Sequence, residues 1–153
     1  MLSQATISLL CMPHRHLPLT RRPAGAIICT LGHMMADMTR LLKALADITR
    51  VRIVALLRGR EELCVCELVE ALQVPQYSVS RHLGVLKAAR IVTDWRQGKW
   101  MHYALDPTLS KEQRDVISAV CALARQEAIL RQDRRRLERC LRPRQEGAMI
   151  QCR

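Results

Sequence analysis

The sequence predicts a mainly α-helical fold with one β-hairpin, and three observations support this class. Apolar residues recur at helical spacing in successive segments from Asp37 onward. β-Branched and aromatic residues flank a glycine turn around Gly98. The chain has 153 residues, of which 49% are hydrophobic, and this suffices for a single core. We therefore expect one domain at residues 34–124, a preceding extension at 1–33 and a basic tail at 125–153.

Residues 1–33 are expected to form a disordered or loosely attached extension. The first acidic residue of the chain is Asp37, and the stretch before it contains several residues that interrupt helices and sheets. These are Pro13, Pro18, Pro23, Gly25 and Gly32. Such a composition does not favour a long helix. Met34 and Met35 mark the point at which the compact domain begins.

Two short helices are predicted in succession after Asp37. The apolar positions of the first share helical spacing and are Met38, Leu41, Leu42, Leu45 and Ile48. Thr49 offers an N-cap for the second helix, and Gly59 closes it. The apolar positions of the second helix are Val51, Ile53, Val54, Leu56 and Leu57.

A brief strand, two further helices and a hairpin follow. Leu63 and Val65 suggest the strand, and residues 67–72 a third helix that ends at Gln73-Val74-Pro75. The fourth helix, residues 76–89, follows a short turn that is typical of a helix-turn-helix, so we name it the reader helix. Residues 91–95 and 100–105 flank a Gly-containing turn, which indicates a β-hairpin. This order of elements predicts a winged helix-turn-helix.

Beyond Pro107 the sequence predicts one long helix. Its apolar stripe consists of Leu109, Val116, Ile117, Val120, Leu123 and Leu130. From residue 125 to residue 144 the chain has eight arginines against three acids, with Leu137 and Leu141 still spaced like a helix face. We interpret this stretch as the solvated end of the last helix, which Arg142-Pro143 terminates.

Charge and composition favour double-stranded DNA as a partner. Lys and Arg number 25 against 14 Asp and Glu, a formal charge of +11 that favours an anionic partner. Aromatic residues are 3% of the chain, so stacking platforms for single-stranded bases are scarce. The reader helix offers polar side chains for base edges and phosphates, namely Gln76, Tyr77, Ser78, Ser80, Arg81 and His82. Arg96 and Lys99 in the hairpin turn add cations for the phosphate backbone or minor groove.

The cysteine count argues against a secreted protein. Seven cysteines are an odd number without regular spacing, so a disulfide framework is not expected. We find no export signal, and the mostly apolar run at residues 24–31 is far shorter than the roughly 20 residues that cross a bilayer. We therefore expect a cytoplasmic protein with reduced thiols and no membrane contact.

Cys64 and Cys66 stand apart because they lie two residues from each other at the start of a predicted helix. Unpaired backbone N–H groups and the helix dipole favour thiolate there, and soft ions select thiolate ligands. The motif contains neither a histidine nor a third cysteine, so a closed zinc site with four local ligands is excluded. Trivalent arsenic or antimony, which takes two or three sulfurs, fits better as the effector. No cofactor is expected.

Four segments carry further motifs: Leu42-Lys43-Ala44-Leu45-Ala46-Asp47-Ile48-Thr49-Arg50, Glu62-Leu63-Cys64-Val65-Cys66-Glu67-Leu68, Ser80-Arg81-His82-Leu83 and Gln97-Gly98-Lys99-Trp100-Met101-His102-Tyr103. With these segments the chain resembles the ArsR/SmtB family of metal-sensing transcriptional repressors, and Cys64-Val65-Cys66 indicates its arsenic-responsive branch. The resemblance covers residues 36 to about 107. It implies a homodimeric winged-helix repressor that leaves operator DNA when arsenite or antimonite binds Cys64 and Cys66.

The chain departs from this branch at two positions. The branch has a third cysteine three residues after the second, where this chain has Val69. We expect Cys64 and Cys66 to suffice, with Cys140 as an optional third metal ligand and Cys121 as a residue of the dimer core. The family commonly has Gly at the position of Arg90, so the end of the reader helix must form without the residue that most easily adopts positive φ.

Other functions are less well supported. The main alternative is a redox-sensing repressor in which the same two thiols oxidise. We find no Cys-x-x-Cys motif, nucleophile elbow or phosphate loop, so an enzyme is not expected. The last helix does not show the acid and histidine pairing of the family's zinc site between subunits, and His82 and His102 are expected to be ordinary polar histidines.

A dimer is expected to form through the first and last helices. Their apolar residues have little other surface to cover in a domain of this size, and a two-fold DNA site requires two reader helices. The residues expected in the interface are Leu41, Leu45, Ile117 and Val120.

Overall fold

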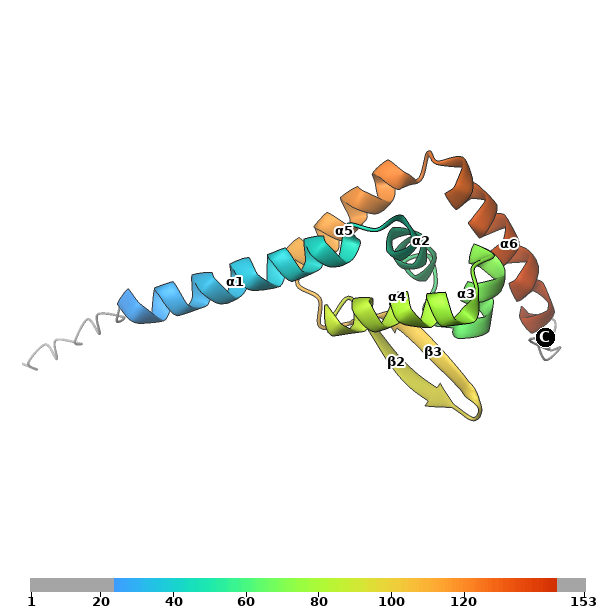
Figure 1. Ribbon diagram of the computed structural model, residues 1–153, viewed down its shortest axis with the longest axis horizontal. Helices are drawn as coiled ribbons and strands as arrows, with labels where there is room; N and C mark the ends of the chain where they lie inside the picture. The colour runs from blue at the N-terminus through green and yellow to red at the C-terminus, as the bar shows by residue number, and fades with distance from the viewer. Residues whose placement is uncertain (1–23, 146–153) are drawn as a thin grey trace, which may run out of the picture.

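Helices dominate the structure, and a small antiparallel sheet lies among them (Figure 1). The computed structural model describes residues 24–145. In chain order its elements are α1 (Ala24–Leu45), α2 (Ile48–Leu57), β1 (Leu63–Cys64), α3 (Val65–Leu72), α4 (Gln76–Ala88), β2 (Val92–Gln97), β3 (Trp100–Leu105), α5 (Lys111–Ala124) and α6 (Ala128–Gln145). The strand order is β1-β3-β2, and both neighbouring pairs are antiparallel. This arrangement confirms the fold class predicted from the sequence.

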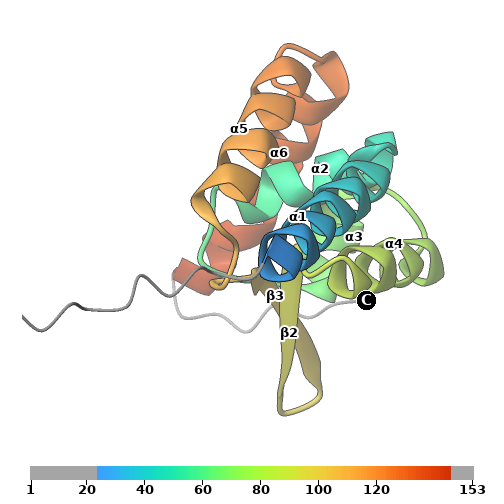
Figure 2. The ribbon, with the colours of Figure 1, turned by 90° about the vertical axis from the view of Figure 1, so that its left-hand side faces the viewer.

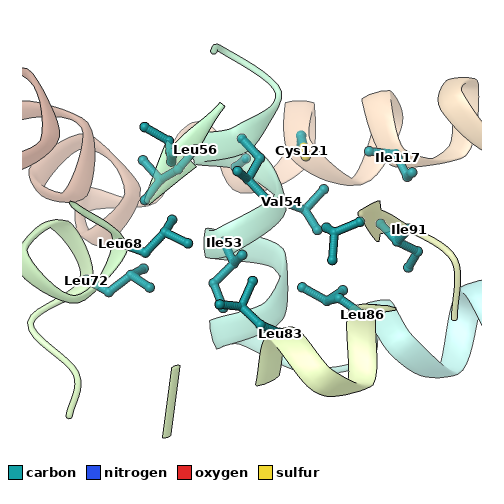
Figure 3. Close-up of a cluster of buried hydrophobic side chains, with 14 of the residues drawn as sticks. Ile53, Val54, Leu56, Leu68, Leu72, Leu83, Leu86, Ile91, Ile117 and Cys121 are labelled. Carbon is teal, nitrogen blue, oxygen red and sulfur yellow. The ribbon is translucent and has the colours of Figure 1, made fainter. Parts of the chain in front are cut away.

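Helix α2 forms the centre of the hydrophobic core. Every residue from Val51 to Leu57 is buried, so α2 is covered on all sides. Figure 3 shows apolar side chains from α3, α4, α5 and the start of the hairpin around it, including Leu68, Leu72, Leu83, Leu86, Ile91, Ile117 and Cys121. The helix that carries Cys66 and the reader helix α4 therefore pack against the same central element.

Helix α1 begins earlier than the sequence predicted. It starts at Ala24, directly after Pro23, and extends away from the rest of the fold (Figure 1). The expectation of no long helix before residue 34 is therefore wrong for residues 24–33. Gly25 and Gly32 each disfavour a helix by only about 1 kcal/mol relative to alanine. The rest of the predicted extension, residues 1–23, lies outside the described residues.

The caps of α2 and α3 are two residues away from their predicted places. Asp47, not Thr49, is the N-cap of α2, and its side chain accepts a hydrogen bond from the Arg50 N–H at 3.0 Å. Helix α3 begins at Val65, so Cys64 is its N-cap and Cys66 lies in its first turn. The carboxylate of Asp47 is a stronger acceptor than the Thr49 hydroxyl, which explains the earlier start of α2.

Arg90 ends the reader helix in the left-handed conformation, with φ of 56°. The N–H of Arg90 donates to the Lys87 carbonyl and that of Ile91 to the Leu86 carbonyl, as in a glycine-terminated helix. A side chain in this region of φ costs about 1 kcal/mol or more, and the buried neighbour Ile91 holds it there. The absence of glycine is thus tolerated.

The C-terminal part of the chain folds back instead of continuing as one helix. Helix α5 ends at Ala124, a turn follows at residues 125–127, and α6 packs against α3 (Figure 1). The prediction of one long helix with a solvated end is therefore wrong. The leucines at helical spacing in α6 are buried: Leu130, Leu137 and Leu141. Helix α6 also continues past Pro143 to Gln145.

Three of the four residues expected in a dimer interface are buried within the chain itself. Leu41 and Ile117 are less than 3% exposed and Leu45 is 7% exposed, while Val120 is half-buried against the same core. Among the side chains of α1 and α5 whose burial is described, the large apolar residues that remain exposed are Met34, Met35, Leu42 and Leu123. Of the described helices, none is both long and apolar enough to cross a membrane.

Candidate DNA interface and thiol site

The helix-turn-helix presents the reader helix at the surface. Helix α3 ends at Leu72, and its C-cap Gln73 turns the chain with a left-handed φ of 53°. The amides of Ser78 and Val79 donate to the Pro75 carbonyl at the start of α4. Buried Val79, Leu83 and Leu86 anchor the inner face of α4. The predicted readers exposed on its outer face are Gln76, Tyr77, Ser80 and Arg81.

Ser78 and His82 differ from these four because they are half-buried. The Nδ1 atom of His82 lies 3.6 Å from an Oδ1 oxygen of Asp47, the N-cap of α2. Burial alone would raise the pKa of Asp47, but the hydrogen bond and charge of Arg50 outweigh it, so the pKa is lowered. His82 therefore faces a carboxylate, and the contact joins the reader helix to the N-cap of α2.

The β2–β3 hairpin forms the wing and projects from the body of the molecule (Figure 2). Gly98 closes its turn with φ of 62°, a conformation that favours glycine. Arg96 donates from Nε to the Gly98 carbonyl at 2.9 Å, and Nζ of Lys99 lies 5.0 Å from the centre of the Trp100 ring. Both cations are exposed, and the hairpin that carries them extends below α4 (Figure 1).

Lys87 and Asp94, which the sequence did not single out, connect the reader helix to the wing. Nζ of Lys87 at the end of α4 lies 2.6 Å from an Oδ1 oxygen of Asp94 on β2. This hydrogen bond is the main reason that the pKa of Lys87 is raised. The ion pair thus links the end of α4 to the first strand of the wing. The one feature of the sequence that indicates this ion pair is the position of two opposite charges on either side of the turn at Arg90.

Cys64 and Cys66 lie at the junction of β1 and α3, where the structure joins them in a disulfide with their Cα atoms 5.4 Å apart. The Sγ atom of Cys64 accepts a hydrogen bond from the Glu67 N–H at 3.4 Å, and a Glu67 carboxylate oxygen accepts one from the Cys64 N–H at 2.7 Å. This is a capping box with a cysteine as the cap. The spacing of Cys64 and Glu67 could have predicted it from the sequence.

His102 on β3 lies directly opposite Cys64 in the sheet, a proximity that the sequence did not predict. Its ring stacks on Trp95 of β2 with the centroids 5.9 Å apart. Its buried Nδ1 lies 3.4 Å from a Glu62 carboxylate oxygen but without hydrogen-bond geometry. The backbone of Cys64 is thus part of the same sheet as the wing, whereas Cys66 lies in α3.

Cys140 lies on α6, which packs along α3. Burial raises the pKa of the Cys140 thiol, and the negative charges of Glu67 and Glu70 raise it further. Its thiol is therefore near the face of α3 that follows the cysteine pair, and it is protonated at neutral pH. Within the described residues, no group of three or more His, Cys, Asp or Glu is already arranged to hold a metal ion.

Comparisons with known proteins identify the family. A family profile described as "Bacterial regulatory protein, arsR family" matches residues 47–94, from the N-cap of α2 into β2. The Arsenical resistance operon repressor of Escherichia coli is 42% identical over 94 residues, which are 60% of this chain and 80% of that protein. The chain belongs to the ArsR family.

Further relatives and solved structures support the ArsR assignment. The Arsenic resistance transcriptional regulator ArsR1 of Pseudomonas putida is 46% identical over 78 residues, 50% of this chain and 61% of that protein. HlyU from Vibrio cholerae matches with a TM-score of 0.53 at 30% identity, over 60% of this chain and 96% of HlyU. The transcriptional repressor BigR from Xylella fastidiosa matches with a TM-score of 0.52 at 27% identity, over 64% of this chain and 95% of BigR. ArsR-family proteins are DNA-binding transcriptional regulators and not enzymes.

Proposed function

We propose that this ArsR-family protein is an arsenite- and antimonite-responsive repressor. It binds operator DNA as a homodimer and releases it when the trivalent metalloid binds Cys64 and Cys66. The observation that carries this proposal is that two sulfurs meet at the start of α3, the helix that turns directly into the reader helix. The names of two relatives, an arsenical resistance operon repressor and an arsenic resistance regulator, support the same effector.

The chemistry of the cysteine pair suits a soft, trivalent ligand. The Cα atoms are 5.4 Å apart, so both sulfurs of the reduced pair can reach one centre without a large change in the backbone. Each thiol gives its proton to a hydroxyl group of arsenous acid, which leaves as water, so the exchange needs no separate base. Reduced thiols are required, as in the cytoplasm.

Transmission begins at the cap of α3. A ligand on the Cys64 sulfur competes with the hydrogen bond that this sulfur accepts from the Glu67 N–H. Loss of an N-cap hydrogen bond lowers stability by about 0.5–2 kcal/mol. Because sulfur is a weak acceptor, the loss at Cys64 lies near the lower of these values. A hundredfold loss of operator affinity requires about 2.7 kcal/mol. The remainder must come from a shift of α3 as a body, which the turn at Gln73 passes to α4.

Two cysteines suffice for this response in our proposal, and Cys140 is an optional third metal ligand. Cys140 lies on α6, the helix that packs along α3. It would replace the third cysteine that the arsenic-responsive branch has at the position of Val69. Its protonated thiol exchanges with arsenous acid as the other two do. Because the three cysteines are not already clustered, α6 must move toward the pair when the third bond forms.

The proposed DNA contacts divide into two groups. The reader helix enters the major groove with Gln76, Tyr77, Ser78, Ser80, Arg81 and His82. Of these, His82 contributes only through ring atoms that do not face Asp47. Arg96 and Lys99 of the wing contact the phosphate backbone or the minor groove.

The dimer required for a two-fold operator is proposed to use the exposed apolar residues of α1 and α5. These are Met34, Met35, Leu42 and Leu123, of which Leu123 is 81% exposed. Large exposed apolar side chains on neighbouring helices are typical of an interface between subunits. The interface therefore lies outside the core residues that the sequence suggested.

A redox-sensing repressor is the second candidate, because the structure joins the same two cysteines in a disulfide. The experiment that separates the candidates follows the release of labelled operator from reduced protein. Arsenite is titrated in one series and hydrogen peroxide in another. Release by arsenite alone supports the proposed function, whereas release by peroxide alone replaces it with the redox sensor.

A further inference from the structure

A cavity of about 420 Å³ lies where α2, α5 and α6 meet. Four arginines line it, and its floor includes the buried thiol of Cys121 and the buried side chain of Leu137. The arginines are Arg58, Arg60, Arg125 and Arg134. They come from the end of α2, the turn after α5 and the body of α6, so the backward turn of the C-terminal helix creates the cavity.

The positive charge of the cavity is not balanced by its lining. Among the described residues that line it, Glu138 is the one carboxylate, and it pairs with Arg60. Arg58 donates to the neutral Ser118 hydroxyl at 2.7 Å and retains further N–H donors. In the described part of the chain, no ion pair joins Arg58, Arg125 or Arg134 to a carboxylate. Three of the four guanidinium groups that line the cavity thus have no ion-pair partner among the described residues.

The same three guanidinium groups also act electrostatically on the Cys121 thiol, which lines the cavity with them. Burial raises the pKa of the Cys121 thiol, although the charges of Arg58, Arg134 and Arg125 all act to lower it. The thiol therefore remains neutral at pH 7 and does not compensate them. Arg58, Arg125 and Arg134 line the same cavity as this sulfur and present their positive charge to one shared space.

Operator DNA does not account for these cations. The junction of α5 and α6 lies at the top of Figure 1, whereas α4 lies below α2 and the hairpin extends to the bottom. DNA held by α4 and the wing is therefore on the other side of the molecule from the cavity. The charge at this junction needs a different partner.

We propose that the cavity binds a small multivalent oxyanion of the phosphate type, through Arg58, Arg125 and Arg134. Guanidinium groups donate pairs of parallel hydrogen bonds to such oxygens, and a shared anion screens their mutual repulsion. The dipole of α2 places about half a negative charge at its C-terminus, and this charge repels the anion. The three positive charges of the arginines outweigh that repulsion. The bound anion connects α2, α5 and α6.

Isothermal titration calorimetry of the reduced full-length protein with inorganic phosphate tests the site. We expect saturable binding of one phosphate per chain, and a melting temperature that rises with phosphate concentration as the site fills. An excess of operator DNA should leave the phosphate affinity unchanged. Displacement of phosphate by DNA, or the absence of saturable binding up to millimolar concentrations, would overturn the proposal.

Single substitutions locate the site. Arg125→Ala and Arg134→Ala should each weaken phosphate binding about tenfold or more, because each removes charge-assisted hydrogen bonds. Arg139→Ala is the matched control, since this exposed arginine lies on α6 but does not line the cavity. It should leave the affinity unchanged. Equal losses in all three variants would mean that only the diffuse positive charge of α6 attracts phosphate, and the proposed site would be rejected. Circular dichroism confirms that each variant is folded.

Discussion

Arg52 and Asp133 form a buried ion pair with two hydrogen bonds that joins α2 to α6. Nε and Nη2 of Arg52 donate to the two carboxylate oxygens of Asp133 at 2.7 and 2.8 Å. The same Nη2 also donates to the Leu72 carbonyl at the end of α3, at 2.8 Å. The side chains of Arg52 and Asp133 are 7% and 1% exposed. The C-terminal helix is therefore built into the core beside the helix that carries Cys66.

Asp133→Ala should destabilise the fold strongly. It leaves the Arg52 guanidinium buried without its carboxylate, and breaking a buried pair in this way costs about 3–5 kcal/mol. At a fixed protein concentration, we expect the melting temperature to fall by about 10 °C or more. Asp115→Ala is the matched control, because its pair with Lys111 is exposed, and it should not measurably change the melting temperature. Equal melting temperatures for both variants would show that α6 does not contribute to the stable core.

The order of α2, α3, α4 and the hairpin could be predicted from the sequence because local signals set each of them. Apolar periodicity marks the helices, and Gly98 marks the turn. The backward turn of α6 could not be predicted, because it depends on a pairing between residues 52 and 133 that are remote in the sequence. An arginine-rich helix that is exposed and one that packs by a single apolar face have similar compositions.

For the candidate site, the sequence predicts which residues are functional better than it predicts which residues they contact. Cys64, Cys66 and the reader residues carry their chemistry in short motifs. Contacts across the fold, such as Cys64 opposite His102 and His82 beside Asp47, depend on strand register and helix packing. A one-residue change of register would turn each β-strand side chain to the other face, and the sequence alone does not define the register of a two-residue strand such as β1.

The double variant Cys64→Ser and Cys66→Ser should bind operator DNA normally but no longer release it with arsenite. A serine at position 64 can still cap α3, so the fold and the reader helix are retained. Fluorescence anisotropy of labelled operator during an arsenite titration measures the response. The Cys121→Ser variant is the control with the same chemical change at a cysteine outside the sensor, and it should still respond. Arsenite-driven release from the double variant would exclude the pair as the sensor.

Arg96→Ala and Lys99→Ala should weaken operator and random DNA alike. Each removes one exposed cation from the wing, so the slope of log affinity against log salt should become about one unit shallower per substitution. Gln76→Ala should instead weaken operator binding alone, because it removes a base contact on the reader helix. If both wing cations can be replaced without any loss of affinity, the wing does not contact DNA.

Leu42→Glu and Leu123→Glu should convert the dimer to a monomer. Each places a charge in the proposed apolar interface of α1 and α5, where a second copy of the chain would have to bury it. Sedimentation velocity at micromolar concentration measures the state. Val85→Glu is the control, since this exposed apolar residue lies on α4 and outside the proposed interface. A wild-type monomer at this concentration would contradict the proposed assembly.

Cys140→Ser should reduce the arsenic–sulfur shell from three sulfurs to two, while arsenite still releases the operator at a higher concentration. Truncation of the tail is unsuitable as a test, because it would also remove Leu137 or Leu141 from the core, whereas the serine variant preserves α6. X-ray absorption on the arsenite complex counts the sulfurs, and a phosphine reductant keeps the thiols reduced without adding a sulfur ligand. A two-sulfur shell in both proteins would show that Cys140 never binds. An unchanged three-sulfur shell in Cys140→Ser would assign the third sulfur to another cysteine, and Cys121→Ser would then test the buried thiol of α5.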